Sequence, residues 1–347
     1  MKEDGFRIVA IGGGTGLSTL LRGLKGYVGS EGHWSIDHLS AIVTVTDEGG
    51  SSGMLRKELS ILPPGDVRNC IVALAEEEAL LSRLFAYRFG TDTPLKGHSL
   101  GNLLLAALID LTGSFESAIL GASEVLAVRG EIYPSTLADI RIRAICDDGT
   151  ELVGETAISG DHFVGAKVPQ HARICRLMID PPDPEPLSRA LEAIHQADVI
   201  AIGPGSLYTS LIPNLLIPKI GEAVRTARAL KVYICNVMTQ PGETDGYTAE
   251  DHLRAIIEHA GLVADLVVIN GRRPTETILE AYREQNQFPV EFASDAIRDL
   301  GATPFFADVV AEDDFVRHDA AALAETIFRL YDRYGRRLQK IRRSSGG

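Results

Sequence analysis

Short apolar runs of strand length recur along the chain and alternate with stretches of helical spacing, and this alternation restricts the fold more than any other feature. The runs are rich in β-branched residues and span 7–11, 40–45, 198–203, 231–237 and 265–270. Stretches such as LSTLLRGL, GEAVRTARAL and AEDHLRAIIEHA have the apolar spacing of amphipathic helices. Strands that are apolar on both faces and joined by helices form a mostly parallel, doubly wound sheet. The sequence therefore predicts an α/β protein that binds ligands at the carboxyl ends of its strands.

One segment, from about residue 130 to 180, interrupts this alternation. Within it, IRIRAICDDGTELVGE reads as two antiparallel strands joined at Asp148-Gly149, a strong hairpin signal. We expect a small antiparallel β-lobe inserted into one α/β domain that spans residues 1–325. Residues 326–347 are rich in Lys and Arg and predict a basic C-terminal helix and tail. This end is either a solvated helix terminus or a contact with a partner or an anionic surface.

Charge, cysteine content and hydropathy exclude several classes of protein. The formal net charge of −13 argues against a nucleic-acid-binding surface, although backbone N–H groups and a few arginines can still bind one anion locally. The four cysteines form no CxxC pattern and are expected to be reduced thiols. The residues before the first strand contain no basic region followed by an apolar stretch, so we expect no signal peptide, and no window approaches ~18 uninterrupted apolar residues. We expect a cytoplasmic protein without a membrane span.

A glycine-rich loop, IGGGTGLSTLLRGL, follows the first strand directly and leads into the first helix. Such a loop brings backbone N–H groups to the place where α/β proteins bind a phosphate at a helix N-terminus. It is not a Walker A loop, because no Gly-Lys-Ser/Thr follows, and Leu17 breaks the GxGxxG pattern. A tight turn without a ligand is the alternative interpretation. The predicted ligand-binding residues of this loop are Gly13, Gly14, Thr15 and Gly16.

The second strand ends in a loop, VTVTDEGGSSG, that places an acid before a second glycine and serine cluster. Ser51 and Ser52 are predicted to form a second cradle that faces the first loop. Asp47 occupies the position at which dinucleotide folds hold a ribose hydroxyl. Asp66 either caps the helix VRNCIVALAEEE or faces the same pocket as Asp47. Two aspartates facing one pocket could coordinate Mg²⁺ or take a proton from a hydroxyl nucleophile.

Three further loops lead into helices, within GHSLGNLLLAAL, AIGPGSLYTSLIPNLL and CNVMTQPGETDGYTAEDHL. Their polar side chains and glycines have the donors and acceptors needed to contact a phosphate, a sugar or a base. Helix capping is the alternative role for the first of these loops, and a polar connection is the alternative for the last. Together with the first two loops they predict a nucleotide or sugar-phosphate pocket. The residues concerned are His98, Asn102, Gly203, Gly205, Ser206, Asn236, Thr239 and Gln240.

These ordered motifs resemble the YvcK-type gluconeogenesis factors, which belong to the same superfamily as CofD, the 2-phospho-L-lactate transferase of deazaflavin cofactor synthesis. The resemblance covers about residues 6 to 325. It implies a Rossmann-like core that binds a nucleotide across the loops. For the YvcK branch it further implies binding of UDP-sugars such as UDP-N-acetylglucosamine, a role in cell shape during growth on gluconeogenic carbon sources, and no settled reaction. A homo-oligomer is compatible with such a fold.

The CofD branch implies a second function, the Mg²⁺-dependent transfer of a phospholactyl group from a nucleotide diphosphate carrier to an alcohol. Under this alternative, Asp47 and Asp66 match the acidic positions near the metal and the acceptor, and they are the candidate catalytic and metal-binding residues. Glu48 stands where the YvcK branch usually has a second aspartate. An NAD-dependent oxidoreductase is a third option, but the chain shows no obvious Tyr-Lys or His-Asp pair for hydride chemistry.

Overall fold

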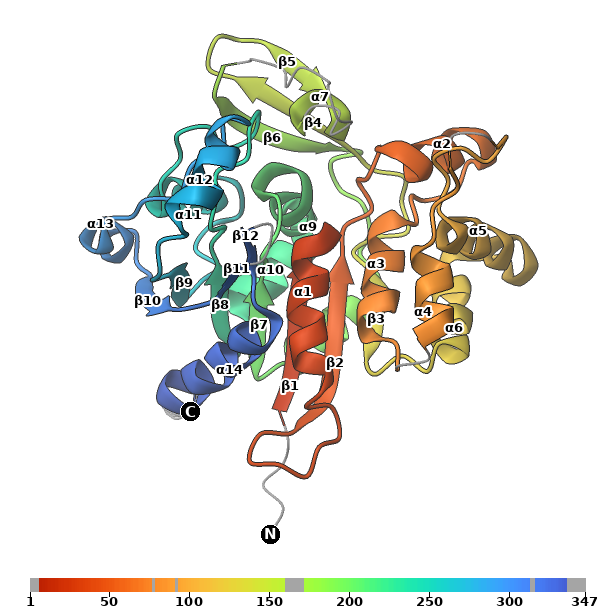
Figure 1. Cartoon of the computed structure of the whole chain (residues 1–347), viewed down its shortest axis with the longest axis horizontal. Coiled ribbons are helices and arrows are strands. Elements are labelled where there is room, and N and C mark those ends of the chain that lie inside the picture. The colour runs from red at the N-terminus through yellow and green to blue at the C-terminus, as the bar shows by residue number, and fades with distance from the viewer. Residues whose placement is uncertain (1–5, 77–78, 91–92, 160–171, 313–315, 336–347) are drawn as a thin grey trace.

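The central element of the molecule is a seven-stranded, fully parallel sheet (Figure 1). A computed structural model describes residues 6–76, 79–90, 93–159, 172–312 and 316–335. The strands lie in the order β10 (Thr303–Ala307), β9 (Leu266–Asn270), β8 (Leu230–Ile234), β7 (Val199–Ile202), β1 (Phe6–Gly12), β2 (Ile36–Val43) and β3 (Glu131–Pro134). The predicted α/β fold with a mostly parallel sheet is confirmed.

The sheet is buried on both faces because successive side chains of its strands alternate between two hydrophobic cores. In β1, Ile8 and Ala10 belong to one core, whereas Val9 and Ile11 belong to the other. The helices of the first core include α1 (Gly14–Lys25), α3 (Gly65–Leu74) and α14 (Ala320–Leu330). Those of the second include α8 (Ser188–Gln196), α9 (Ile212–Leu216), α10 (Pro218–Thr226) and α11 (Ala249–Ala260).

The order of the strands reverses at β1. From β1 the chain builds outward through β2 to β3, and it later returns to the other side of β1 with β7 and continues outward to β10. The topological switch point therefore lies between β1 and β7. Doubly wound folds bind their ligands in the crevice at this point, outside the carboxyl ends of the strands.

A group of helices flanks the β3 side of the sheet (Figure 1). It contains α2 (Gly50–Leu59), α4 (Ala79–Ala86), α5 (Leu100–Thr112) and α6 (Phe115–Val125). Within the described residues no single helix has the length and hydropathy of a membrane span, and α5 and α6, which reach it together, are bent by 119°.

The predicted β-lobe is a three-stranded antiparallel sheet at one end of the molecule (Figure 1). It consists of β5 (Glu151–Val153), β4 (Arg141–Cys146) and β6 (Ile174–Asp180), and the short helix α7 (Glu155–Ser159) follows β5. The β4–β5 hairpin turns at Gly149, whose φ of +86° suits glycine. The observed lobe starts at Arg141 rather than near residue 130, because β3 pairs with β2 in the main sheet.

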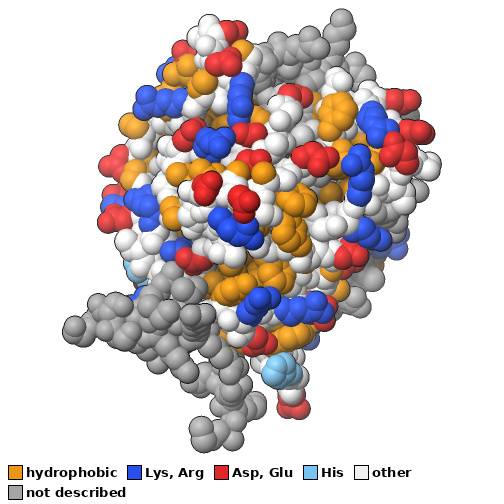
Figure 2. Space-filling model, turned by 90° about the vertical axis from the view of Figure 1, so that its left-hand side faces the viewer, with side chains coloured by type: hydrophobic (Ala, Val, Ile, Leu, Met, Phe, Trp, Pro, Cys, Tyr) orange, Lys and Arg blue, Asp and Glu red, His pale blue; other side chains and the backbone are white. Residues whose placement is uncertain are grey.

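The C-terminal third adds α12 (Glu276–Arg283), α13 (Ser294–Asp299) and a two-stranded ribbon of β11 (Val310–Glu312) and β12 (Val316–His318). On the face that Figure 2 shows, acidic and basic side chains are interspersed around hydrophobic ones. The described chain ends in α14 and one π-helical turn, Tyr331–Gly335. The predicted basic tail, residues 336–347, lies outside the described residues.

Candidate functional site

The loops that follow β1 and β7 are in direct contact at the switch point. A Cβ atom on Gly16 would lie 2.5 Å from the Pro204 carbonyl oxygen, so only glycine permits this approach. The Asn214 side-chain amide, on α9, donates to the Gly12 carbonyl oxygen at 3.0 Å. The Thr46 hydroxyl, after β2, donates to the Thr209 carbonyl oxygen, also at 3.0 Å. The loops after β1, β2 and β7 therefore form one connected surface.

The N-terminus of α1 opens onto this surface, where the Asp66 carboxylate accepts one of its N–H groups, that of Gly14. The helix begins at Gly14, whose φ is +62°, and its N-cap residue Gly13 makes no side-chain capping bond. Thr15 is exposed in the first turn. Uncapped N–H groups at a helix N-terminus attract anions through hydrogen bonding and the helix dipole. The predicted residues Gly13, Gly14, Thr15 and Gly16 thus lie together at a helix N-terminus, as a loop that binds a phosphate would require.

Asp66 lies against this glycine loop. A Cβ on Gly13 would be 2.6 Å from an Asp66 carboxylate oxygen, and the Gly14 N–H donates to the Asp66 carboxylate. Burial of the carboxyl and the neighbouring charge of Asp47 raise the pKa of Asp66 to about 7. The capping alternative is wrong, because Pro64 is the N-cap residue of α3 and Asp66 sits in its first turn. Asp47 and Asp66 lie near enough for their charges to interact, and we refer to them as the acidic pair.

Asp47 is held by backbone groups on two sides. One of its carboxylate oxygens accepts the Gly49 N–H at 2.9 Å. The other would be 2.5 Å from a Cβ on Gly65, so α3 approaches it closely. The neighbouring Glu48 makes a different contact: its carboxylate lies 3.8 Å from the guanidinium of Arg56. The longer side chain of Glu48 is therefore part of a separate ion pair.

A third carboxylate, Glu155 of the inserted lobe, joins the acidic pair. Its Oε2 accepts the Glu48 N–H at 2.8 Å, and its carboxyl shares a hydrogen bond with Asp47. Burial and the charge of Asp47 raise the pKa of Glu155 well above its usual range. Sequence reasoning missed this residue, because more than 100 positions separate it from Asp47 and only the folding of the lobe brings them together.

Ser51, Ser52, His98 and Asn102 form the side of the site nearest α5. The Ser51 hydroxyl lies 3.3 Å from His98 Nδ1, and the Asn102 amide donates to the Ser52 hydroxyl at 3.4 Å. The α5 N-terminus is capped by Ser99, so neither His98 nor Asn102 supplies the capping side chain. The structure thus brings the predicted residues of the second and third loops together.

The guanidinium of Arg68, on α3, also contacts this part of the site, and sequence reasoning missed it. It is buried and donates to the Ser99 hydroxyl at 2.7 Å. Burial and the nearby charge of Arg88 lower its pKa to about 10, while Asp47 and Asp66 act in the opposite direction. Arg68 therefore partly balances the negative charge of the acidic pair.

In the loop after β8, the side chains predicted to contact a ligand form hydrogen bonds with other parts of the protein. The Asn236 amide donates to the Gly205 carbonyl oxygen at 2.9 Å, and its oxygen accepts the Gly205 N–H at 3.4 Å. The Thr239 hydroxyl accepts the Phe288 N–H at 2.9 Å, and the Gln240 amide donates to Glu243 at 2.8 Å. These three side chains brace the loop, and Asn236 ties it to the Gly203–Ser206 segment.

Glu243 makes a second tie between the same two loops. Its carboxylate is buried and accepts the Tyr208 N–H at 3.1 Å and the Thr209 hydroxyl at 2.9 Å. Gly203, Gly205 and Ser206 precede this tie, and Gly203 has a φ of +83°. The loops after β7 and β8 are therefore fixed to each other by buried polar side chains.

Replacing Asn236 by alanine is expected to destabilise the protein by about 1–3 kcal/mol and to weaken ligand binding, because the Gly205 backbone loses two hydrogen bonds. Thermal and urea unfolding measure the first effect, and calorimetric titration measures the second. Asn286, which lies at a positive φ of 56° outside this loop, provides a control as Asn286→Gly. Unchanged stability and affinity in Asn236→Ala would show that this tie does not hold the site.

A divalent cation fits the acidic pair together with a phosphate. Within the part of the chain that the structure describes, no group of three or more His, Cys, Asp or Glu is arranged to hold a metal ion alone. Mg²⁺, however, usually takes one or two carboxylates and completes its shell with substrate phosphates and water. Asp47 and Asp66 carry oxygen atoms of the kind that would hold such a cation beside the glycine loop.

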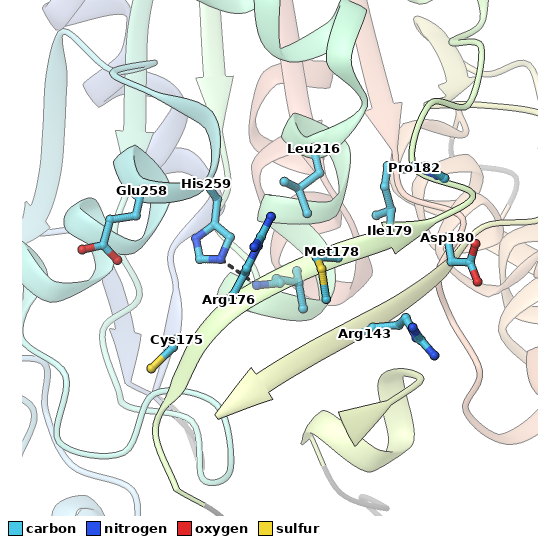
Figure 3. Close-up of a pocket in the computed structure, with 11 residues that line it drawn as sticks. Arg143, Cys175, Arg176, Met178, Ile179, Asp180, Pro182, Leu216, Glu258 and His259 are labelled. Carbon is cyan, nitrogen blue, oxygen red and sulfur yellow. Dashed lines mark hydrogen bonds between the residues drawn. The ribbon is translucent and has the colours of Figure 1, made fainter. Parts of the chain in front are cut away.

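Of the cavities in the described part of the chain, two that lie outside the glycine loops adjoin the lobe and the carboxyl edge of the sheet. The larger, of about 740 Å³, runs along β6 and is lined by residues of the lobe, Leu216 and the end of α11 (Figure 3). The smaller, of about 130 Å³, lies at the carboxyl ends of β8 and β9, next to Asn236. It is lined by polar, charged and aromatic residues that include Asn270, Arg272 and Phe292. This smaller cavity continues the carboxyl edge of the sheet away from the acidic pair.

Comparison with known proteins assigns the family. Residues 8–310 match the family model of the 2-phospho-L-lactate transferase CofD. The chain is 44% identical to the gluconeogenesis factor of Bacillus subtilis strain 168, over 92% of this chain and 96% of that protein. The protein belongs to the gluconeogenesis factor family. The family's member from Halalkalibacterium halodurans is 48% identical over 92% of this chain and 95% of its own length.

A solved structure agrees with the family assignment. The crystal structure of a UPF0052 family member from Bacillus halodurans has a TM-score of 0.85 and 46% sequence identity, and it covers 94% of this chain and 100% of that chain. The predicted membership of the gluconeogenesis factors and the CofD-like domain are both confirmed.

Proposed function

We propose that this gluconeogenesis factor family member is a regulatory protein that binds a nucleotide sugar, of the UDP-N-acetylglucosamine kind, across the β1/β7 switch point. The observation that carries the proposal is the contact between two glycine loops at this point, where doubly wound folds bind nucleotides. The proposed role is to adjust cell shape and envelope precursors during growth on gluconeogenic carbon sources.

The diphosphate would lie on the N-terminus of α1. Backbone N–H groups of Gly13, Thr15 and Gly16 would donate to it, while that of Gly14 donates to Asp66, and the Thr15 hydroxyl would add a bond from the exposed side of the turn. Asp66 lies so close to this loop that its carboxylate and the bound diphosphate, both negatively charged, would be neighbours. Asp47 and Asp66 would hold a divalent cation, which when bound supplies the charge that brings phosphate and carboxylate together.

The uridine and sugar would extend along the carboxyl edge of the sheet. The cavity beside Asn236 continues this edge and offers the guanidinium of Arg272 and the ring of Phe292. Planar bases stack on aromatic rings and guanidinium groups. The hydrogen bonds within the loop after β8 would hold this part of the crevice in its binding conformation in the absence of the ligand.

Calorimetric titration with UDP-N-acetylglucosamine, with GDP and NAD as controls and with or without Mg²⁺, tests this function. Chromatography of each mixture afterwards detects turnover. We expect tight binding of the UDP-sugar, which remains intact. Preference for GDP or NAD, or consumption of the UDP-sugar, would contradict the proposal.

Replacing Thr15 by valine removes one hydroxyl at nearly constant volume. If this hydroxyl donates to a phosphate, UDP-N-acetylglucosamine should bind more weakly by about 1–3 kcal/mol, or roughly 5- to 150-fold. Thr19→Val is the matched control, because the Thr19 hydroxyl donates to the Thr15 carbonyl oxygen within the same helix. Equal affinities of Thr15→Val and the wild type would show that the diphosphate does not bond to the Thr15 hydroxyl of the first loop.

One observation favours the transferase as a second candidate. A carboxyl group with a pKa of about 7, such as that of Asp66, can take a proton from an acceptor hydroxyl at neutral pH. Under this alternative, Asp66→Asn would abolish transfer from a nucleotide diphosphate-linked donor while sparing the cation-free affinity for the nucleotide. Full transfer activity in Asp66→Asn would exclude this role for Asp66.

A further inference from the structure

We propose that Glu155 of the inserted lobe is a positioning residue of the acidic site, which orients Asp47 for cation-dependent ligand binding. This inference rests on the function proposed above. It makes the docked lobe a functional part of the site, although the lobe lies outside the doubly wound core.

The contacts of Glu155 carry the argument. Its Oε2 accepts the Glu48 N–H at 2.8 Å, and its carboxyl group shares a proton in a hydrogen bond with the Asp47 carboxyl, so it fixes both the backbone and the side chain at this turn. The Gly49 N–H donates to Asp47 Oδ1 at 2.9 Å and is a second restraint on this side chain. Without Glu155, Asp47 keeps one of these two restraints and gains freedom to rotate about its side-chain torsions. A ligand or cation that needs Asp47 in one orientation would then bind more weakly.

The sequence around Glu155 allows it to come this close. Gly154 has a φ of +89°, and a Cβ at this position would lie 2.1 Å from a carboxylate oxygen of Glu48. Glycine is therefore required immediately before Glu155. The Gly154 N–H also donates to the Ile142 carbonyl oxygen of β4 at 2.8 Å, which anchors the start of α7 to the lobe's own sheet. The backbone that carries Glu155 is therefore hydrogen-bonded to the lobe's sheet.

The lobe itself is fixed to α11 on the far side of the molecule from α5. His259 Nε2 accepts the Leu177 N–H at 2.8 Å, and Figure 3 shows this ring directed at β6. The Arg173 guanidinium lies 3.2 Å from the Asp251 carboxylate and 4.3 Å from the centre of the Tyr247 ring. These contacts orient the lobe independently of Glu155. Replacing Glu155 alone is therefore expected to leave the lobe docked.

The test compares Glu155→Ala and Glu155→Gln with the wild type. Glutamine can still accept the Glu48 N–H through its oxygen and donate to Asp47 through its amide, whereas alanine can do neither. Glu151→Ala is the control, because Glu151 is exposed on the same lobe and pairs with Arg143 at 3.2 Å. The readout is the ratio of the UDP-N-acetylglucosamine dissociation constants without and with Mg²⁺. Electron paramagnetic resonance of Mn²⁺ reports the bound cation separately.

We expect Glu155→Ala to lower this ratio and the affinity for Mn²⁺ in the presence of the nucleotide sugar by about tenfold, as loss of a buried charged hydrogen bond does. Glu155→Gln should stay within about threefold of the wild type, since it keeps both bonds. Cation-free binding should be close to that of the wild type and of Glu151→Ala, even if loss of the Glu48 N–H acceptor lowers the unfolding temperature of Glu155→Ala. Rescue by glutamine distinguishes positioning from direct coordination.

Three results would overturn the inference. An unchanged ratio in Glu155→Ala would mean that Asp47 is oriented without Glu155. An equal loss of binding with and without Mg²⁺ would indicate a general structural role, and a glutamine variant as weak as the alanine variant would mean that the charge of Glu155 acts on the cation directly. If the wild type binds no nucleotide under any condition, the proposed function fails, and this inference fails with it.

Discussion

Replacing Gly16 by alanine is expected to weaken binding of UDP-N-acetylglucosamine by at least about 100-fold and to destabilise the protein by about 1–3 kcal/mol. The added methyl group would lie 2.5 Å from the Pro204 carbonyl oxygen and 2.8 Å from the Pro204 carbonyl carbon. Both are backbone atoms, so the loops after β1 and β7 must move apart at the switch point. Calorimetric titration and thermal unfolding measure the two effects.

Gly26→Ala is the matched control for this substitution. Gly26 is the C-cap of the same helix, with a φ of −62°, and a Cβ there would meet no atom within 4 Å. Alanine at this position should leave binding unchanged and stability the same or slightly higher. If Gly16→Ala bound the nucleotide sugar as well as Gly26→Ala does, the ligand could not lie between the two glycine loops.

Replacing Asp66 by asparagine is expected to stabilise the cation-free protein at pH 8 by up to roughly 4 kcal/mol, from 1.36 kcal/mol per pKa unit. The pKa of Asp66 is raised from 3.8 to about 7, so the folded protein binds this proton more tightly than the unfolded chain does. Stability should therefore fall as the pH rises from about 4 to about 7 and stay low above this range. Asparagine carries no such charge and removes this dependence. Urea unfolding between pH 5 and pH 8, without divalent cations, measures the part of this difference that falls between pH 5 and pH 7, about 2.7 kcal/mol at 1.36 kcal/mol per pH unit.

The same substitution should have the opposite effect on ligand binding. Because Asp66 is a proposed cation ligand, Asp66→Asn should abolish the Mg²⁺-dependent part of nucleotide-sugar binding and spare the cation-free part. Asp37→Asn is the control, since Asp37 is exposed on β2. A variant that is less stable than the wild type at pH 8, or that keeps its full response to Mg²⁺, would refute the assigned roles of Asp66.

The central strands could be predicted from the sequence because they are buried on both faces and read as continuous apolar runs. The two outer strands, β3 and β10, were not predicted. β3 is only four residues long and ends in Pro134, and β10 contains Pro304 and a half-exposed Phe306. Edge strands pair on one side only and tolerate proline, so their sequences lack the apolar run of a central strand.

The site was predictable to the extent that it lies on loops next to the central strands. Asp47 and Asp66 were predicted as site residues because they lie on loops at the carboxyl ends of the strands, and parallel strands bring these ends together at one edge of the sheet. Glu155 could not be found in this way, because it reaches Glu48 and Asp47 through a tertiary contact between distant segments. Glu243 lies on such a loop, but its bonds to Tyr208 and Thr209 also depend on tertiary structure. Nor does a sequence show that Asn236 and Gln240 bond within the protein, because their polar groups suit a ligand and a backbone equally well.

Anomalous diffraction from crystals grown with UDP-N-acetylglucosamine and Mn²⁺ tests the central claim most directly, because it locates the cation and the diphosphate together. We predict one Mn²⁺ peak between the carboxylates of Asp47 and Asp66, with the diphosphate on the N-terminus of α1 and in contact with Thr15. Density for the ligand in another cavity, such as the one along β6, with no Mn²⁺ at the acidic pair, would contradict the account.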